Sequence, residues 1–264
     1  MEPRTVAVRE GMFQAEVREY GAPSAEPLLF LHGSSGLLLD PYLELLGERF
    51  RVVAPQHPGW GASTGLEHID DPIDMALYYY DFLDALRIDA AHVVGHSLGG
   101  MFAAEIAALD PHRVRRLVLS NAVGLWRDDA PVLDFFSCGM EELQRAVWAE
   151  PESDLVRSRA PDPEDKEALA GLMFDRMQSL AAAAKFLWPI PDRGLKKRLH
   201  RIAAPSLIVW GERDGLVPPV YADEFGARLR NARVEVLRGC AHMPMIERPE
   251  EWVRVVVEFL ARKT

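Results

Sequence analysis

Short apolar runs rich in β-branched residues alternate with helical patterns, and this alternation most constrains the fold. The strand candidates are PLLFLHG, FRVVAPQ, AHVVGHS, RRLVLSNA, PSLIVWG and RVEVLRG. The middle runs are continuously apolar, which is typical of parallel strands covered on both faces. Helical patterns follow at residues 40–50, 71–88, 98–111, 217–230 and 249–263. Alternation around Gly11 predicts an opening antiparallel hairpin. The sequence thus predicts a mostly parallel α/β sheet.

The alternation stops between about Gly124 and Arg201, where the chain has helical periodicity but no strand pattern. The helical stretches cover residues 134–150 and 163–191. A chain of 264 residues, 48% of them hydrophobic, is long enough for one large domain with an insertion. We predict a core from residues 1–123 and 202–264 and an inserted helical cap from residues 124–201. Long insertions at loop positions usually carry function.

Composition excludes several classes of function. The net charge is −10 and the basic residues form no long block, which argues against a nucleic-acid partner. The apolar runs are far shorter than the roughly 20 residues that cross a bilayer. The first residues show no export signal, so we expect a cytoplasmic protein without a membrane partner. Cys138 and Cys240 cannot form a disulfide framework, and no cluster has metal-ligand spacing, so no metal is expected. A monomer and a homodimer remain equally open.

Ser97 stands where a strand pattern passes directly into a helical pattern, in VVGHSLGGMFAAEIAAL. Gly95 and Gly99 leave room for a sharp turn in which Ser97 can adopt a positive φ. This pattern predicts a nucleophile elbow, which lifts the hydroxyl above the carboxyl edge of the sheet and points a helix N-terminus at the ligand. The alternative is an ordinary loop serine.

A serine hydroxyl is a weak nucleophile, so this interpretation requires a base, an orienting carboxylate and oxyanion donors. His242 lies in a loop between the last strand and the last helix and is the predicted base. Asp214 follows the strand that ends at Trp210 and is the predicted acid, with Glu212 as its local rival. The backbone N–H groups of Ser34 and Leu98 are the predicted oxyanion hole.

Serine, aspartate and histidine in this chain order form the catalytic triad of the α/β-hydrolase superfamily, which the sequence resembles over essentially its full length. The likeness lies in LHGSSG, HPGWGAS, GHSLGG, VWGERDGLVPP and GCAHMPMIERP. The resemblance implies an eight-stranded, mostly parallel sheet flanked by helices, a helical cap, no metal and no organic cofactor.

Departures from subfamily patterns narrow the expected chemistry. Haloalkane dehalogenases and epoxide hydrolases have aspartate at the position of Ser97, and proline iminopeptidases typically have tryptophan where this chain has Leu98. Meta-cleavage C–C hydrolases often have asparagine at the position of His96. The expected function is hydrolysis of a small to medium apolar ester or lactone through an acyl-enzyme.

Three alternatives to ester hydrolysis stay open. They are C–C hydrolysis of a vinylogous diketone, a cofactor-free perhydrolase or haloperoxidase, and a ligand-binding receptor on a hydrolase scaffold. Apolar side chains of the cap and one loop tryptophan could line the substrate pocket or pack the core, and the pocket candidates are Trp60, Trp126, Phe136, Met140 and Trp188. The basic stretch LKKRLHRI is either a solvated helix face or a carboxylate clamp.

Overall fold

The computed structural model describes residues 2–38, 41–190 and 192–262. In this part of the chain, eight strands form one sheet in the order β1-β2-β4-β3-β5-β6-β7-β8, with only the pairings of β2 antiparallel. The strands are β1 Arg4–Val8, β2 Phe13–Tyr20, β3 Pro27–Leu31, β4 Arg51–Pro55, β5 Ala91–His96, β6 Val114–Ser120, β7 Ser206–Gly211 and β8 Ala232–Leu237. The predicted hairpin and mostly parallel eight-stranded sheet are confirmed.

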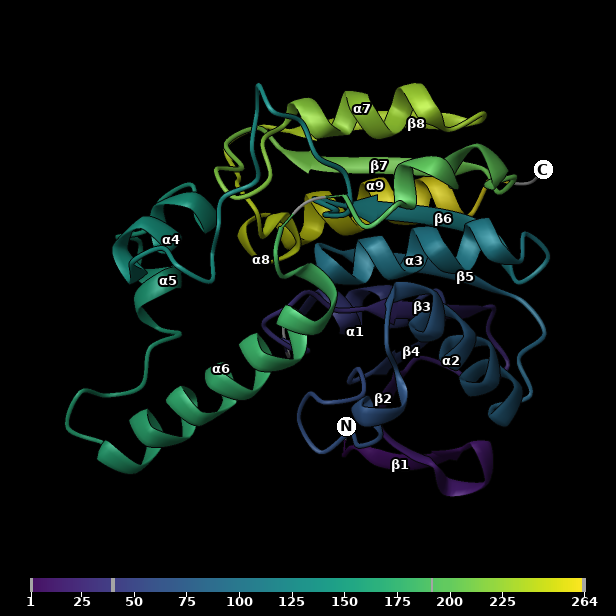
Figure 1. Cartoon of the computed structure of the whole chain (residues 1–264), viewed down its shortest axis with the longest axis horizontal. Helices are drawn as coiled ribbons and strands as arrows, with labels where there is room; N and C mark the ends of the chain where they lie inside the picture. Colours follow the sequence, from purple (N-terminus) through teal and green to yellow (C-terminus); the bar gives the residue numbers. More distant parts are fainter. Residues whose placement is uncertain (1, 39–40, 191, 263–264) are drawn as a thin grey trace.

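Helices cover both faces of the sheet, which explains why the central strands are apolar throughout (Figure 1). One apolar cluster lies under α1, α8 and α9, and the other under α2, α3 and α7. Their bounds are α1 Pro41–Gly47, α2 Pro72–Ala85, α3 Leu98–Leu109, α7 Val220–Arg228, α8 Pro244–Glu247 and α9 Pro249–Leu260. Local sequence fixes some of these ends: Asp71 caps α2 by accepting the N–H groups of Ile73 and Asp74, and Pro72 opens the helix.

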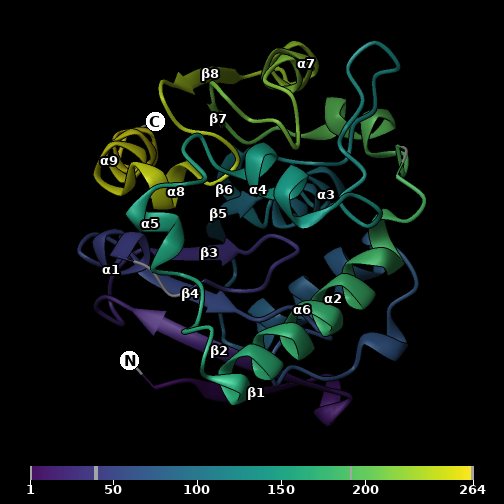
Figure 2. The ribbon, with the colours of Figure 1, turned by 90° about the vertical axis from the view of Figure 1, so that its left-hand side faces the viewer.

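The β6–β7 segment, residues 121–205, has no strand among its described residues. Its helices extend beyond one end of the sheet, whereas its final turns lie beside α3 (Figure 1). It contains α4 Met140–Val147, α5 Asp154–Arg157, α6 Lys166–Leu187 and two 3-10 turns, Leu195–Lys197 and Leu199–Arg201. The first half of α6 is exposed, whereas its last turns are buried against the core. Viewed toward that end of the sheet, α6 runs obliquely across the molecule below α4 and α5 (Figure 2).

The helices of the β6–β7 segment are shorter than the sequence predicts. The predicted helix 134–150 is divided: the carbonyl oxygen of Asp134 accepts the N–H groups of Ser137 and Cys138 in a single turn, and α4 begins only at Met140, because Gly139 is extended with φ −70° and ψ 158°. The predicted helix 163–191 begins at Lys166, where Asp165 caps it by accepting the N–H of Ala168. Asp40, Pro191 and Lys263, which the predicted helices included, lie outside the described residues.

An ion pair fastens the end of the β6–β7 segment to α3. Arg198 donates from Nε and Nη2 to the two carboxylate oxygens of Glu105, each at 2.6 Å, and Glu105 is completely buried. The pair holds the pKa of Arg198 above its ordinary value. The basic stretch LKKRLHRI therefore contributes a structural contact to a buried carboxylate of the protein itself.

Arg198→Ala should lower the free energy of unfolding by about 3 kcal/mol, because it leaves a buried carboxylate without its partner. Urea denaturation followed by fluorescence measures this loss. The matched control is Arg254→Ala, which breaks an exposed pair with Glu258 on α9 and should cost less than about 0.5 kcal/mol. Equal losses in the two variants would contradict a stabilising role for the buried pair.

Candidate active site

Ser97 occupies a sharp turn between β5 and α3, as the sequence predicts. Its φ of 53° and ψ of −116° are strained for a residue with a side chain. A Cβ on Gly99 would lie 2.2 Å from the carbonyl oxygen of Leu31, so only glycine lets α3 approach the end of β3 this closely. Leu98 opens α3, and its N–H therefore has no acceptor within the helix.

The candidate site is assembled at the carboxyl ends of four adjacent parallel strands. Ser97 follows β5, Asn121 follows β6, Asp214 follows β7 and His242 follows β8. All four residues are buried. In an open parallel sheet this edge is where ligands bind, because loops from neighbouring strands converge there.

Asp214 and His242 are in direct contact. His242 Nδ1 donates to Asp214 Oδ2 at 2.8 Å. The other carboxylate oxygen, Oδ1, accepts the N–H groups of Leu216 and Val217, both at 2.9 Å. The predicted rival Glu212 is exposed and accepts the N–H of Gly239 at 3.2 Å. The buried aspartate is therefore the carboxylate that orients the imidazole and fixes its tautomer.

Asn121 is a member of this network whose role the sequence did not reveal. Its Nδ2 donates to Asp214 Oδ2 at 2.7 Å and to the carbonyl oxygen of Ala241 at 3.3 Å. The residue has a positive φ of 48° directly after β6. Asn121 ends the strand candidate RRLVLSNA, which places it at a strand end, but its partners are 93 and 120 positions away along the chain.

His96, the residue before Ser97, lies against His242. The two rings are 4.9 Å apart, and His96 Nε2 donates to the carbonyl oxygen of His242 at 2.8 Å. Burial, and secondarily His242, lowers the pKa of His96 to about 3. His96 is therefore a neutral donor that ties the end of β5 to the histidine loop.

The loop after β3 carries the predicted oxyanion donor Ser34. A Cβ on Gly33 would lie 3.2 Å from Ser97 Cβ, so this loop passes next to the elbow. Trp60 Nε1 donates to the carbonyl oxygen of Ser34 at 2.9 Å. This contact fixes the Ser34 loop to the segment after β4, the strand that pairs with β3.

Two buried histidines support the same loop. The N–H of His57 donates to His32 Nε2 at 2.9 Å, and His57 Nε2 donates to the carbonyl oxygen of His32 at 2.8 Å. His57 Nδ1 accepts from the hydroxyl of Tyr79. Burial lowers the pKa of His57 to about 3 and that of His32 well below its ordinary value. Both rings are thus neutral, and each is held in one tautomer.

The candidate pocket side chains differ in their surroundings. Trp60 is completely buried behind the Ser34 loop. Phe136 stacks on Phe135 with ring centres 4.3 Å apart and meets the edge of Trp188 at 5.6 Å. Met140 and Trp188 are exposed on the β6–β7 segment, and Trp126 Nε1 donates to Asp128.

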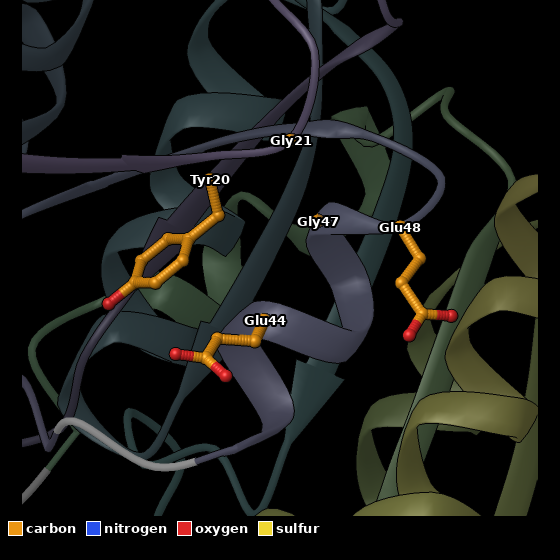
Figure 3. A pocket seen from close by; sticks show the side chains of 5 residues that line it. All are labelled: Tyr20, Gly21, Glu44, Gly47 and Glu48. Carbon is orange, nitrogen blue, oxygen red and sulfur yellow. The ribbon is translucent and has the colours of Figure 1, made fainter. Parts of the chain in front are cut away.

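A surface pocket lies far from this edge of the sheet. It is lined by Tyr20, Gly21, Glu44, Gly47 and Glu48 (Figure 3). Tyr20 pairs with Val52 near the start of β4, which places the pocket at the amino ends of the parallel strands. Its lining has no serine, cysteine or histidine, so it lacks the residue types that meet at the opposite edge of the sheet.

Metal clusters and membrane-spanning helices are both absent from residues 2–38, 41–190 and 192–262. These residues contain no group of three or more side chains suited to bind a metal ion. No helix among them is long and apolar enough to cross a membrane.

Comparison with known proteins gives the family. A family model described as alpha/beta hydrolase fold matches residues 26–249. A 2-hydroxy-6-oxononadienedioate/2-hydroxy-6-oxononatrienedioate hydrolase of Pseudomonas putida is 30% identical over 285 residues, covering 97% of this chain and 96% of that protein. Mouse monoacylglycerol lipase ABHD6 is 27% identical, covering 91% and 77%. The solved 2-hydroxy-6-oxo-6-phenylhexa-2,4-dienoate hydrolase of Rhodococcus sp. strain RHA1 superposes with a TM-score of 0.75 at 21% identity, covering 99% of each chain.

The protein therefore belongs to the α/β-hydrolase fold family, as its sequence motifs indicate. It is a hydrolase with an eight-stranded, mostly parallel sheet flanked by helices.

The buried neutral histidines predict acid sensitivity. The pKa of His96 falls from an ordinary 6.5 to about 3 on folding, so between these values the unfolded chain binds a proton that the folded chain does not. Stability contributed by the neutral ring is present above about pH 6.5 and is lost as the pH falls. His96→Asn should reduce the loss of unfolding free energy between pH 6 and pH 5 by about 1 kcal/mol, as measured by urea denaturation at each pH. An unchanged pH dependence would contradict this assignment.

Proposed function

We propose that the protein is a serine hydrolase that cleaves a C–C bond in a vinylogous diketone acid, with Ser97 as nucleophile, His242 as base and Asp214 as orienting acid. The hydrogen-bonded Asp214–His242 pair, at the strand edge that also presents Ser97, carries this proposal. Because Nδ1 of His242 donates to Asp214, Nε2 is left to take the Ser97 proton. The N–H groups of Ser34 and Leu98 then bind the oxyanion.

The choice of bond rests on relatives and on carbon chemistry. Attack of Ser97 Oγ on the ketone carbon gives a tetrahedral oxyanion. The adjacent C–C bond breaks only if the departing carbon can pass its electron pair to a second carbonyl. A 2-hydroxy-6-oxo-dienoic acid must therefore first shift its enol proton to that carbon, which gives the vinylogous diketone in which the electron pair can be delocalised. The His242 imidazolium returns its proton to that carbon, and water then releases the acid from the acyl-enzyme. A buried site suits this route because it keeps bulk water from competing with Ser97 for the ketone carbon.

Ester or lactone hydrolysis, the main expectation from the sequence, is the second candidate. It uses the same triad and oxyanion donors, and monoacylglycerol lipase ABHD6 is an ester-cleaving relative. The relative from Pseudomonas putida favours the C–C reaction more strongly, because its similarity extends over nearly the whole of both chains. These relatives are hydrolases, which supports turnover over a receptor role.

Residues 124–201 of the β6–β7 segment are the proposed cap over this site, with the core formed by residues 1–123 and 202–264. The carbonyl oxygen of Ala146 accepts the N–H of Gly215, and that of Val147 accepts the N–H of His242. The end of α4 thus lies directly on the loops of the acid and the base. Phe136 and Trp188, which contact each other, are the proposed roof of the substrate pocket.

The substrate assignment is tested by comparing two reactions. We expect kcat/KM for a 2-hydroxy-6-oxo-dienoic acid, followed as loss of its dienolate absorbance, to exceed that for p-nitrophenyl acetate and butyrate by at least about 100-fold, about 2.7 kcal/mol of differential transition-state binding. Ser97→Ala should abolish both reactions in a folded protein. Faster ester cleavage would contradict the C–C assignment and favour ester hydrolysis. Activity retained in Ser97→Ala would show that Ser97 is not the nucleophile.

Asp214→Asn should lower kcat by roughly 10⁴-fold, because the amide no longer fixes the imidazole tautomer needed by the base. Glu212→Gln, two residues earlier and exposed, should change kcat by less than about twofold. Steady-state kinetics on the better substrate measures both variants. A greater loss of kcat in Glu212→Gln would assign the role of orienting acid to Glu212 instead of Asp214.

A further inference from the structure

Glu247, the last residue of α8, is a half-buried carboxylate that the proposed mechanism does not use. It belongs to the motif GCAHMPMIERP, in which only the histidine has an assigned role. Its Oε1 accepts the N–H of Ala149 at 2.8 Å, and its Oε2 accepts the N–H of Ala241 at 2.7 Å. One side chain thus bridges the β6–β7 segment and the residue directly before His242.

The same short stretch of chain makes three neighbouring contacts with the core. The carbonyl oxygens of Ala146 and Val147 accept the N–H groups of Gly215 and His242 at 2.9 and 3.0 Å, and Ala149 donates to Glu247. We call residues 146–149 the docking strip. It contacts the loop of the acid, the base itself and the carboxylate of Glu247.

A negative charge on Glu247 is disfavoured by its surroundings, so its presence there argues for a specific role of the carboxylate. Burial raises the pKa of Glu247, and Asp214 acts in the same direction. The two N–H donors and His242 oppose these effects. Hydrogen bonds from backbone N–H groups to a carboxylate are stronger than those to neutral acceptors, so this bridge is a firm one.

We propose that Glu247 is a positioning residue that couples docking of the strip to placement of His242. The N–H groups of Ala149 and Ala241 both bind this one carboxylate. Release of either N–H group therefore lets the carboxylate, and with it the other bonded segment, move. The backbone bond from His242 to Val147 then loosens with it. The inference rests on the proposed function, since it takes His242 as the base.

Two variants separate the parts of the bridge. Glu247→Gln keeps the size of the side chain, but its NH₂ group cannot accept a hydrogen bond, so at most one of the two N–H groups stays satisfied. Glu247→Asp keeps the charge and is one methylene shorter, so it too can reach only one of them, and it serves if the glutamine variant does not fold. The matched control is Glu212→Gln, another carboxylate that accepts a backbone N–H from the same loop, that of Gly239, but is exposed.

Hydrogen exchange measured by mass spectrometry on the full chain tests the coupling without substrate. Both Glu247 variants should speed exchange about tenfold in peptides covering the docking strip and in those covering residues 238–243, the loss expected for one charge-assisted hydrogen bond. Glu212→Gln should leave the strip unchanged. Faster exchange at only one of the two segments, or at both in the control, overturns the coupling.

Kinetics on the better substrate tests the consequence for the base. In Glu247→Gln, kcat should fall about tenfold, with a smaller change in KM, because a loosened His242 affects proton transfer more than ground-state binding. Faster exchange at both segments with unchanged kcat would make Glu247 merely structural and overturn the positioning role. If the wild type cleaves neither substrate class, the proposed function fails, while the exchange result still decides the coupling.

Discussion

The close approach of α3 to the end of β3 is the constraint on which the rest of the site depends. Gly99 permits it, because any side chain there would meet the carbonyl oxygen of Leu31. The approach forces the chain to turn within one residue, and this turn holds Ser97 at a positive φ. The strain is offset by the burial of α3 against the sheet, where nearly every residue of the helix is covered. A rigid helix then presents its first free N–H groups beside the serine hydroxyl, so the proposed nucleophile and one proposed oxyanion donor are positioned by one backbone feature.

Around this turn, the buried histidines differ in their hydrogen-bond partners. His32, His57 and His96 are held neutral in the interior and act as fixed donors and acceptors. His242 alone among these four contacts a carboxylate. Asp214 in turn accepts hydrogen bonds from Asn121, Leu216 and Val217. The neighbouring histidines therefore do not compete with His242 for the carboxylate of Asp214.

The segment inserted after β6 contacts the candidate site at the end of α4. The docking strip bonds to the loops after β7 and β8, so the segment is fastened where Asp214 and His242, the proposed acid and base, lie. The other end of the segment is held to α3 by the ion pair between Arg198 and Glu105. Between these two anchors the first half of α6 extends away from the core (Figure 1). This arrangement gives the inserted segment fixed ends and an exposed middle.

Local sequence determined the strands, the hairpin, the elbow and the order of serine, aspartate and histidine, because periodicity, glycine spacing and strand-end residues are properties of neighbouring positions. It also narrowed the acid to Asp214 or Glu212, since both lie within a few residues of one strand end. Tertiary structure decided what depends on strand order. Asn121 meets Asp214, Glu247 meets Ala149 and Arg198 meets Glu105 only because the sheet brings together segments about a hundred residues apart. The shorter α4 was likewise decided by the backbone at Gly139, which is extended and separates the helix from the turn at Asp134, a break that periodicity does not record.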